Sequence, residues 1–157
     1  MSNLQAGQKA PDFVLTDQNR QPVHIADRIG KKIIVLYFYP KDFTGGCTKE
    51  ACGFRDSYTI FSDAGAEVIG VSADDPETHA RFIEEYKLPF TLLSDPEHKV
   101  ADTFGIGKMM GIFPGRVTFV IDREGVIRDA FESNTDMDAH IQEAKKVVLQ
   151  LDQESVK

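Results

Sequence analysis

The chain of 157 residues is 41% hydrophobic and 27% charged, which is ordinary for a globular protein, and we expect one domain over residues 1–157. Its formal net charge is −7 and it has no basic cluster, which argues against nucleic acid or an anionic membrane as the main partner. The first residues show neither a basic start nor an apolar run, and no apolar run could span a bilayer, so a cytoplasmic protein is expected.

The first part of the chain predicts a hairpin, two buried strands and a helix between them. Asp12–Asp17, a polar turn and the short stretch 23–25 are typical of a β-hairpin. Lys31–Tyr39 and Glu67–Asp74 are β-branched and aromatic without alternation, which indicates strands buried on both faces. Apolar residues recur at spacings of three and four over Cys47–Asp63, which predicts a helix there.

The middle of the chain predicts a helix and an inserted strand–helix pair. Asp75–Leu88 is typical of a helix, with a proline placed well in its first turn. Phe90–Asp95 predicts a short strand, and Pro96–Gly105 a short helix ended by glycine. The segment 106–116 holds three glycines and a proline, so we expect a loop.

The last part predicts a hairpin and a closing helix. Residues 117–122 and 126–131 flank a glycine turn, and Thr135–Leu151 begins with a capping threonine and acidic residues. Strands that alternate with helices imply parallel β-α-β units, and the late hairpin adds an antiparallel edge. The order predicts an α/β protein of thioredoxin-like fold, with an N-terminal β-hairpin and a mid-chain β–α insertion.

Both cysteines of the chain lie five residues apart, where a buried strand is expected to turn into a helix. Two cysteines are too few for a secreted disulfide scaffold, and in a reducing cytosol a thiol pair more often indicates redox chemistry or metal binding. A helix N-terminus favours the thiolate, so we expect the pKa of Cys47 to lie below about 8.5. Gly45 and Gly46 let the backbone approach a small ligand, and Thr44 can cap the helix or offer its hydroxyl.

The spacing of the two thiols constrains any bond between them. Residues five apart in one helix have Cα atoms about 8.7 Å apart, whereas a disulfide needs Cα atoms within about 7 Å. Cys47 and Cys52 can therefore bond only if the helix start unwinds. Gly53 weakens the helix by about 1 kcal/mol relative to alanine, and Cys52 falls on its polar side. The layout suits a protected nucleophile that reacts first and a more exposed thiol that reaches it later.

The residues alone leave other interpretations open. Cys47 can be a small core residue and Cys52 an incidental surface thiol. A metal site has weaker support, because no C-x-x-C or H-x-x-x-H pair is present and the histidines are scattered. No metal, haem or flavin is expected. The four histidines are His24, His79, His98 and His140.

The stretch around the cysteines resembles the active-site signature of the peroxiredoxins. Pro40, Thr44 and Cys47 match the pattern P-x-x-x-T-x-x-C, and Cys52 resembles the second cysteine of the Q-type subgroup, also called bacterioferritin comigratory proteins. Stretches such as "EVIGVSAD" and "GRVTFVID" extend the likeness over nearly the whole chain. The chain departs from the family at Gly45, where proline is common, and the extra glycine should loosen the loop.

The resemblance implies roles for individual residues. Cys47 would be the peroxidatic thiolate that attacks the O–O bond of a peroxide and becomes a sulfenic acid. Pro40 would shield it from water, and Thr44 would hydrogen-bond the peroxide. Arg116 matches the arginine that steadies the thiolate and the peroxide oxygens, and Cys52 would be the resolving thiol.

Further implications concern the surroundings and partners of the site. Glu50 resembles the family's acid that orients the arginine. The substrates would be hydrogen peroxide and organic hydroperoxides, reduced to water and alcohols in antioxidant defence. Thioredoxin or a similar dithiol would reduce the disulfide. A monomer is expected, with a dimer as the alternative. An apolar collar for alkyl hydroperoxides or a partner is a further hypothesis, built from Phe43, Met109, Met110, Ile112 and Phe113.

Two rival functions use the same thiols. A thioredoxin-type disulfide reductase would be expected to carry C-x-x-C after the strand, so the four-residue gap counts against it. A non-enzymatic redox sensor or holdase would use the disulfide to change shape and bind a partner. Steady peroxide turnover with a thioredoxin system separates the peroxidase from the sensor, and reduction of insulin would favour the reductase.

Overall fold

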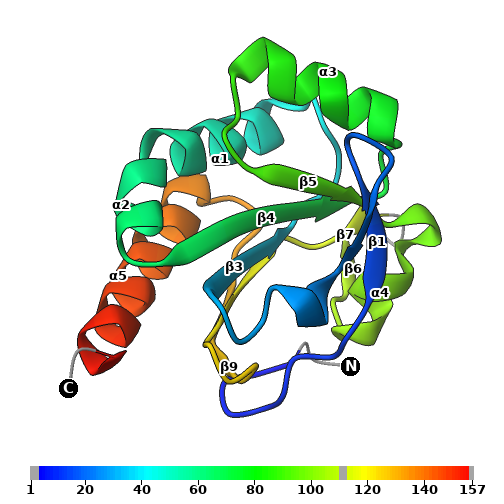
Figure 1. The fold of residues 1–157 in the computed structure, drawn as a ribbon. Helices are drawn as coiled ribbons and strands as arrows, with labels where there is room; N and C mark the ends of the chain where they lie inside the picture. The colour runs from blue at the N-terminus through cyan, green and yellow to red at the C-terminus, as the bar shows by residue number, and fades with distance from the viewer. Residues whose placement is uncertain (1–3, 110–112, 156–157) are drawn as a thin grey trace.

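The computed structural model describes residues 4–109 and 113–155 and has a sheet covered by helices on both faces (Figure 1). The main sheet has seven strands in the order β2-β1-β5-β4-β3-β8-β9. Its strands are β1 (Val14–Asp17), β2 (Pro22–His24), β3 (Ile33–Phe38), β4 (Ala66–Ser72), β5 (Thr91–Ser94), β8 (Val117–Ile121) and β9 (Ile127–Glu132). The helices are η1 (Ile25–Asp27), α1 (Gly45–Asp56), α2 (Tyr58–Asp63), α3 (Pro76–Tyr86), η2 (Pro96–His98), α4 (Lys99–Thr103) and α5 (Met137–Ser155).

The pairing of the strands follows from the connections between them. β3, β4 and β5 are parallel, because each is joined to the next through helices. β8 pairs antiparallel with β3 and β9, and β9 forms one edge of the sheet. At the other edge, β1 of the β1–β2 hairpin pairs antiparallel with β5. The expected α/β architecture with an N-terminal hairpin, an inserted strand–helix pair and an antiparallel edge is confirmed.

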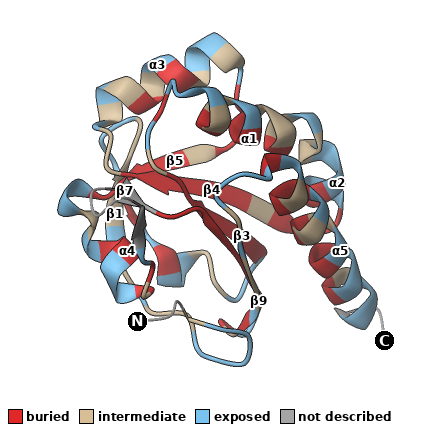
Figure 2. Cartoon of the chain, turned by 180° about the vertical axis from the view of Figure 1, so that it is seen from behind, coloured by how far each residue is buried: buried red, intermediate tan, exposed pale blue. Residues whose placement is uncertain are grey.

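The core has two halves, one on each face of the sheet. Successive side chains of a strand point to opposite faces, and β3 is buried throughout. Ile33, Val35 and Tyr37 face a cluster built with α1, α2, α3 and α5. Ile34 and Leu36 face the other cluster, built with η1, α4 and β8. Figure 2 shows this burial along the strands and the inner faces of the helices.

Three sequence-based expectations need correction. The helix predicted over Cys47–Asp63 begins earlier, at Gly45, and is broken into α1 and α2 at Ser57. The cap of α5 is Asp136, whose carboxylate accepts from the amide of Ala139 at 3.0 Å, and not Thr135. The predicted loop 106–116 contains a small antiparallel pair, β6 (Lys108–Met109) and β7 (Phe113–Pro114).

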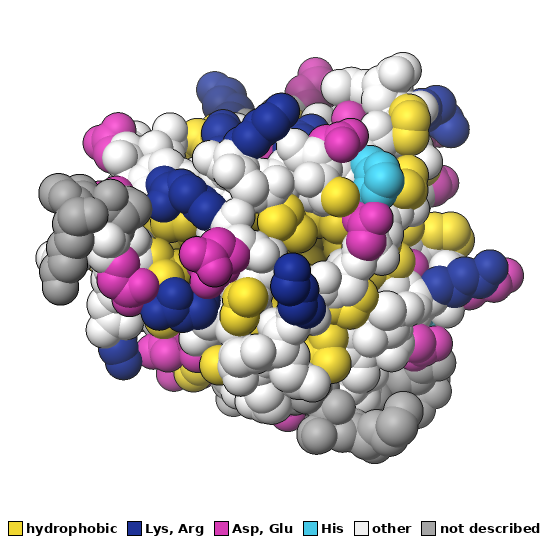
Figure 3. Space-filling view, turned by 60° about the horizontal axis from the view of Figure 1, so that its bottom comes forward, with side chains coloured by type: hydrophobic (Ala, Val, Ile, Leu, Met, Phe, Trp, Pro, Cys, Tyr) yellow, Lys and Arg dark blue, Asp and Glu magenta, His cyan; other side chains and the backbone are white. Residues whose placement is uncertain are grey.

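The surface carries charges of both signs. Figure 3 shows Lys and Arg side chains interspersed with Asp and Glu on one face of the molecule. Within the described ranges, no helix is long and apolar enough to cross a membrane. The expectation that neither nucleic acid nor a membrane is a partner stays a prediction.

Gly70 allows close packing at the centre of the sheet. A Cβ atom there would lie 2.7 Å from Leu92 and 2.8 Å from the ring of Tyr37, which are contacts too short to hold. We therefore expect Gly70→Ala to lower the free energy of unfolding by about 1–3 kcal/mol, measured by urea denaturation. Gly107→Ala is the control, because a Cβ atom at Gly107 meets no described atom within 4 Å. Equal stability of the two variants would show that the neighbours of Gly70 move aside freely.

Candidate active site

Cys47 lies in the first turn of α1, directly beyond the loop that follows β3. The carboxyl ends of β3, β4 and β5 meet at this edge of the sheet, where α/β proteins commonly place their ligands. Cys47 is 1% exposed and packs in the core cluster that contains Tyr37 and Tyr39. Its sulfur is therefore near the helix N-terminus and shielded from bulk water.

Thr44 occupies the N-cap position of α1 in an extended conformation. Its hydroxyl donates to the carbonyl oxygen of Lys41 at 3.0 Å. The side chain therefore makes a hydrogen bond within the loop before α1 and does not cap the helix. A hydrogen bond with this side chain also lowers the pKa of Cys47. The capping role expected for Thr44 is therefore wrong, since its side chain makes no cap hydrogen bond, and a hydroxyl offered to a peroxide stays a prediction.

Arg116 comes just before β8 and reaches the same helix turn. Its Nη1 donates to Glu50 Oε1 at 3.1 Å, and its backbone amide donates to the side chain of Asn134 at 2.9 Å. A Cβ atom at Gly46 would lie 2.8 Å from Nη2 of Arg116. The absence of a side chain at Gly46 therefore lets the guanidinium lie against the backbone next to Cys47.

Glu50 is fully buried one turn after Cys47. Burial raises its pKa to about 7, although the charge and hydrogen bond of Arg116 act in the opposite direction. Its Oε1 has the Arg116 partner, whereas Oε2 has no hydrogen-bond partner among the described residues. The expected acid beside the arginine is thus found in contact with it.

His140, on α5, is a member of this network that the sequence did not reveal. Its Nδ1 lies 3.6 Å from Glu50 Oε2 and accepts from the hydroxyl of Thr118 at 2.8 Å. Its Nε2 donates to the carbonyl oxygen of Ser133 at 2.7 Å, and burial lowers the pKa of the ring. Both contacts fit a neutral imidazole. A buried polar residue beside Ile141 on the apolar face of α5 is the only sequence signal that it left.

The pKa of Cys47 is shifted in the direction opposite to our expectation. Burial raises it and is the largest effect, while Thr44 and the charge of Arg116 lower it. The net shift is upward, so the predicted lowering is wrong for this closed arrangement. The sequence argument included the helix N-terminus but not the loss of water around the sulfur.

Cys52 lies in the same intact helix as Cys47 and is half-buried. Both thiols are free, and Cys52 lines a surface pocket of about 260 Å³ between residues of α1 and of α5. A Cβ atom at Gly53 would lie 2.9 Å from Ile141, so this glycine also allows α5 to pack closely on α1. The expectation that the helix must unwind before the two thiols bond fits this geometry.

Pro40 and Phe43 form the outer part of the loop. Pro40 is half-buried at the end of β3, and the ring centroid of Phe43 lies 5.0 Å from that of Phe82 on α3. Phe43 is 42% exposed, and its part in an apolar collar stays a prediction. Met110 and Ile112 of the predicted collar lie outside the described residues, and the side chains of Met109 and Phe113 are not described either.

The comparisons with known proteins agree on one family. The model of the AhpC/TSA family matches residues 6–130. Peroxiredoxin Q of Arabidopsis thaliana, named as chloroplastic, is 49% identical over 92% of this chain and 67% of its own length. Its counterpart from Sedum lineare is 46% identical over 92% of this chain and 78% of its own length.

Solved structures give the same result. The peroxidoxin BcpB from Mycobacterium tuberculosis superimposes with a TM-score of 0.88 at 36% identity, over 94% of this chain and 98% of that chain. A structure of peroxiredoxin Q from Xanthomonas campestris superimposes with a TM-score of 0.85 at 27% identity, over 94% and 98%.

The buried Glu50 carboxyl makes stability depend on pH. Its pKa rises from 4.5 to about 7 on folding, so the folded chain keeps a proton that the unfolded chain loses. The stability that this proton contributes is fully present below pH 4.5, the pKa of the unfolded chain. It is lost as the pH rises through about 7, the pKa of the folded chain. We expect Glu50→Gln to lose less stability than the wild type between about pH 5 and about pH 8. The urea midpoints of the wild type and Glu50→Gln, measured at both pH values, test this. An equal change of the midpoint with pH in the two proteins would contradict it.

The two adjacent glycines before Cys47 allow a matched test of where Arg116 lies. Gly46→Ala should push the guanidinium away from the helix turn and raise the pKa of Cys47, because a positive charge near the thiolate is lost. Gly45→Ala should leave that pKa unchanged, since a Cβ atom there meets no described atom within 4 Å. Ultraviolet titration of the Cys47 thiolate, with Cys52→Ser added to each variant, measures both pKa values. Equal pKa shifts in the two variants would show that the flexibility of the loop, and not the place of Arg116, sets the pKa of Cys47.

Proposed function

This chain belongs to the AhpC/TSA family as a Q-type peroxiredoxin, and we propose that its thiol peroxidase activity runs through Cys47 and Cys52. The single observation that carries the proposal is the setting of Cys47. Its side chain is buried in the first turn of α1, and the guanidinium of Arg116 lies against the adjacent Gly46. The side chain of Thr44 and the charge of Arg116 lower the pKa of Cys47, although burial keeps the net shift upward. A reactive thiolate needs such compensation in a closed site.

In the first step, the Cys47 thiolate attacks one oxygen of the peroxide. A sulfur–oxygen bond forms, the O–O bond breaks, and Cys47 becomes a sulfenic acid. The other oxygen leaves with the bonding electron pair and takes up a proton, which yields water or an alcohol. The positive charge of Arg116 stabilises the negative charge that develops on this oxygen.

The residues around Cys47 have different proposed roles in binding the peroxide and in orienting the groups of the site. Thr44 offers a hydroxyl for the peroxide, and Pro40 at the end of β3 shields the sulfur from water. Glu50 holds the guanidinium of Arg116 through a hydrogen bond of 3.1 Å. Because Glu50 and Arg116 are both buried, this contact fixes the direction from which the arginine faces the site.

In the second step, the Cys52 thiolate attacks the sulfur of the sulfenic acid. The sulfur–sulfur bond forms, and the oxygen on Cys47 leaves as water after taking up a proton. The start of α1 unwinds for this, since one helix keeps the two Cα atoms about 8.7 Å apart. Thioredoxin or a similar dithiol then reduces the disulfide by thiol–disulfide exchange.

The substrates, the oligomeric state and the location in the cell are also part of this proposal. Hydrogen peroxide and organic hydroperoxides are the proposed substrates, and the exposed ring of Phe43 supports binding of an alkyl group. We keep the prediction of a monomer that works in the cytoplasm, with a dimer as the alternative. Several of its relatives are named as chloroplastic.

The cysteine variants test the two steps separately. We expect Cys47→Ser to abolish peroxide consumption, because the attacking sulfur is lost. We expect Cys52→Ser to complete one turnover per chain with thioredoxin present and then stall, because its sulfenic acid lacks an internal partner. Peroxide consumption and intact mass after one equivalent of hydrogen peroxide are the measurements.

The two variants also serve as controls for each other. Loss of two hydrogens in the wild type, with a peptide that links both cysteines, is the mass expected for the complete cycle. Full activity of Cys47→Ser would overturn the assignment of the nucleophile. Continued thioredoxin-dependent turnover by Cys52→Ser would leave Cys47 in place but remove Cys52 as the resolving thiol.

A further inference from the structure

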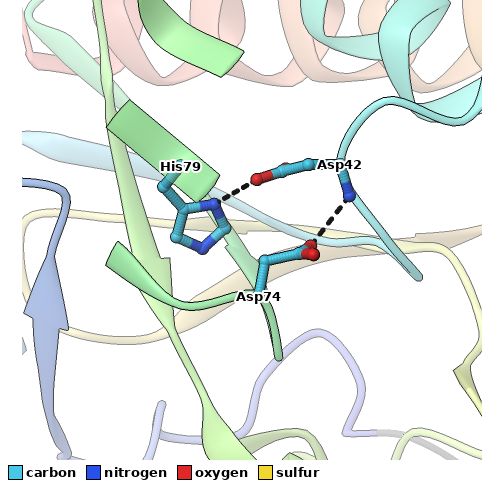
Figure 4. Close-up of side chains that lie close together, drawn as sticks. All are labelled: Asp42, Asp74 and His79. Carbon is cyan, nitrogen blue, oxygen red and sulfur yellow. Dashed lines mark hydrogen bonds and ion pairs between the residues drawn. The ribbon is translucent and has the colours of Figure 1, made fainter. Parts of the chain in front are cut away.

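The loop that leads to Cys47 is fixed by a buried polar cluster that the proposed reaction steps do not use. The cluster joins Asp42 of the loop, Asp74 beyond β4 and His79 of α3 (Figure 4). The side chains of Asp42 and His79 are both 0% exposed. Buried charged groups are costly unless they are paired, so a specific role for this pair is expected.

Both ring nitrogens of His79 have acceptors. Nδ1 lies 2.6 Å from Asp42 Oδ2, and Nε2 donates to the carbonyl oxygen of Leu93 at 3.0 Å. A carbonyl oxygen can only accept, so Nε2 carries a proton, and Nδ1 shares a second proton with the carboxylate. The hydroxyl of Tyr39 donates to the other carboxylate oxygen. Asp42 is thereby tied to Tyr39 directly after β3, to α3 and, through His79, to β5.

The backbone of the loop is held in the same place. The amide of Asp42 donates to Asp74 Oδ2 at 2.8 Å, and the same oxygen accepts from the hydroxyl of Ser72 at 2.6 Å. The ligand atoms of the cluster lie within 4.8 Å of one another, a spacing that would also suit a cation. However, these bonds already engage both oxygens of Asp42, Oδ2 of Asp74 and both nitrogens of His79. The cluster therefore closes on itself and holds the loop.

The next loop residue is anchored on the same helix face. Phe43 has a φ of +65°, in the left-handed region that bulky residues rarely adopt. Its ring packs on Phe82, which lies three residues after His79 and so on the same side of α3. Two successive loop residues are thus held by α3, and Thr44 follows them directly.

We propose that His79 is a positioning residue for the peroxidase reaction, which through Asp42 holds the loop so that Thr44 stays beside Cys47. This inference rests on the proposed role of Cys47. Thr44 is the first of the contributions that lower the pKa of Cys47 after the effect of burial. A displaced loop would therefore slow attack on the peroxide and shift the pH at which Cys47 reacts.

The test uses the reduced 157-residue chain and hydrogen peroxide in a single turnover. His79→Leu removes both hydrogen-bonding nitrogens, whereas His79→Gln keeps an amide that can donate. We expect His79→Leu to slow oxidation of Cys47 about tenfold or more, the scale on which small misplacements act, and to move the midpoint of its pH profile upward. His79→Gln should recover part of both effects.

A remote core variant separates positioning from general loss of stability. Ile121 is fully buried and pairs with Ile34 at the start of β3, whereas the loop follows the other end of that strand. Ile121→Ala should lower the urea midpoint but leave the oxidation rate and the pH midpoint as in the wild type. Equal loss of rate in Ile121→Ala and His79→Leu, or an unchanged rate and pH profile in His79→Leu, would overturn the proposal.

A second variant covers the case in which His79→Leu does not fold. Asp42→Ala removes the carboxylate that faces His79 and accepts from Tyr39, and it should slow oxidation of Cys47 and raise the pH midpoint in the same way. Cys47→Ser is measured beside it. If Cys47→Ser stays active, the proposed nucleophile is wrong; if it is inactive while Asp42→Ala behaves as Ile121→Ala, only the positioning role fails.

Discussion

The ion pair between Glu50 and Arg116 is the interaction on which the geometry of the site depends. It joins α1 directly to the residue that precedes β8, across the start of the helix that carries Cys47. Both side chains are buried, so the pair loses hydration that its attraction must offset. The raised pKa of Glu50 is the sign of that cost. The neutral His140 ring lies 3.6 Å from the carboxylate and adds no charge of its own.

In the proposed cycle, the same helix holds the site together and then unwinds at its start. α1 buries Cys47 and Glu50 and packs on α5, which favours the closed arrangement. The glycines do not share one purpose: Gly46 and Gly53 make room for Arg116 and Ile141, whereas a side chain at Gly45 would meet no described atom. Gly45 is therefore the position at which packing does not explain the glycine. It stands at the first residue of α1, where proline would fit the helix well and stiffen its start. A glycine there favours unwinding.

Local patterns in the sequence predicted the fold well, and contacts between distant residues explain the rest. The unbroken apolar run of β3 correctly predicted burial on both faces, because alternate side chains of the strand enter the two core clusters. Thr44, Cys47 and Arg116 were identified by likeness to a family motif, and the structure brings them together. By contrast, Asp42 and His79 are 37 positions apart, and no local pattern links them. The predicted direction of the Cys47 pKa shift was wrong for the same reason, because burial of the sulfur depends on packing from several distant elements.

The elements around Cys47 thus divide into a fixed part and a part that must move. Before Cys47, the loop is tied to β3, α3, β4 and β5 through Asp42, and Phe43 packs on α3. After Cys47, α1 is held by packing on α5 and by the Glu50–Arg116 pair. Disulfide formation in the proposed cycle needs only the second part to rearrange. A loop that stays in place while α1 unwinds keeps Thr44 ready for the next peroxide, and the boundary between the two parts falls at Gly45 and Gly46.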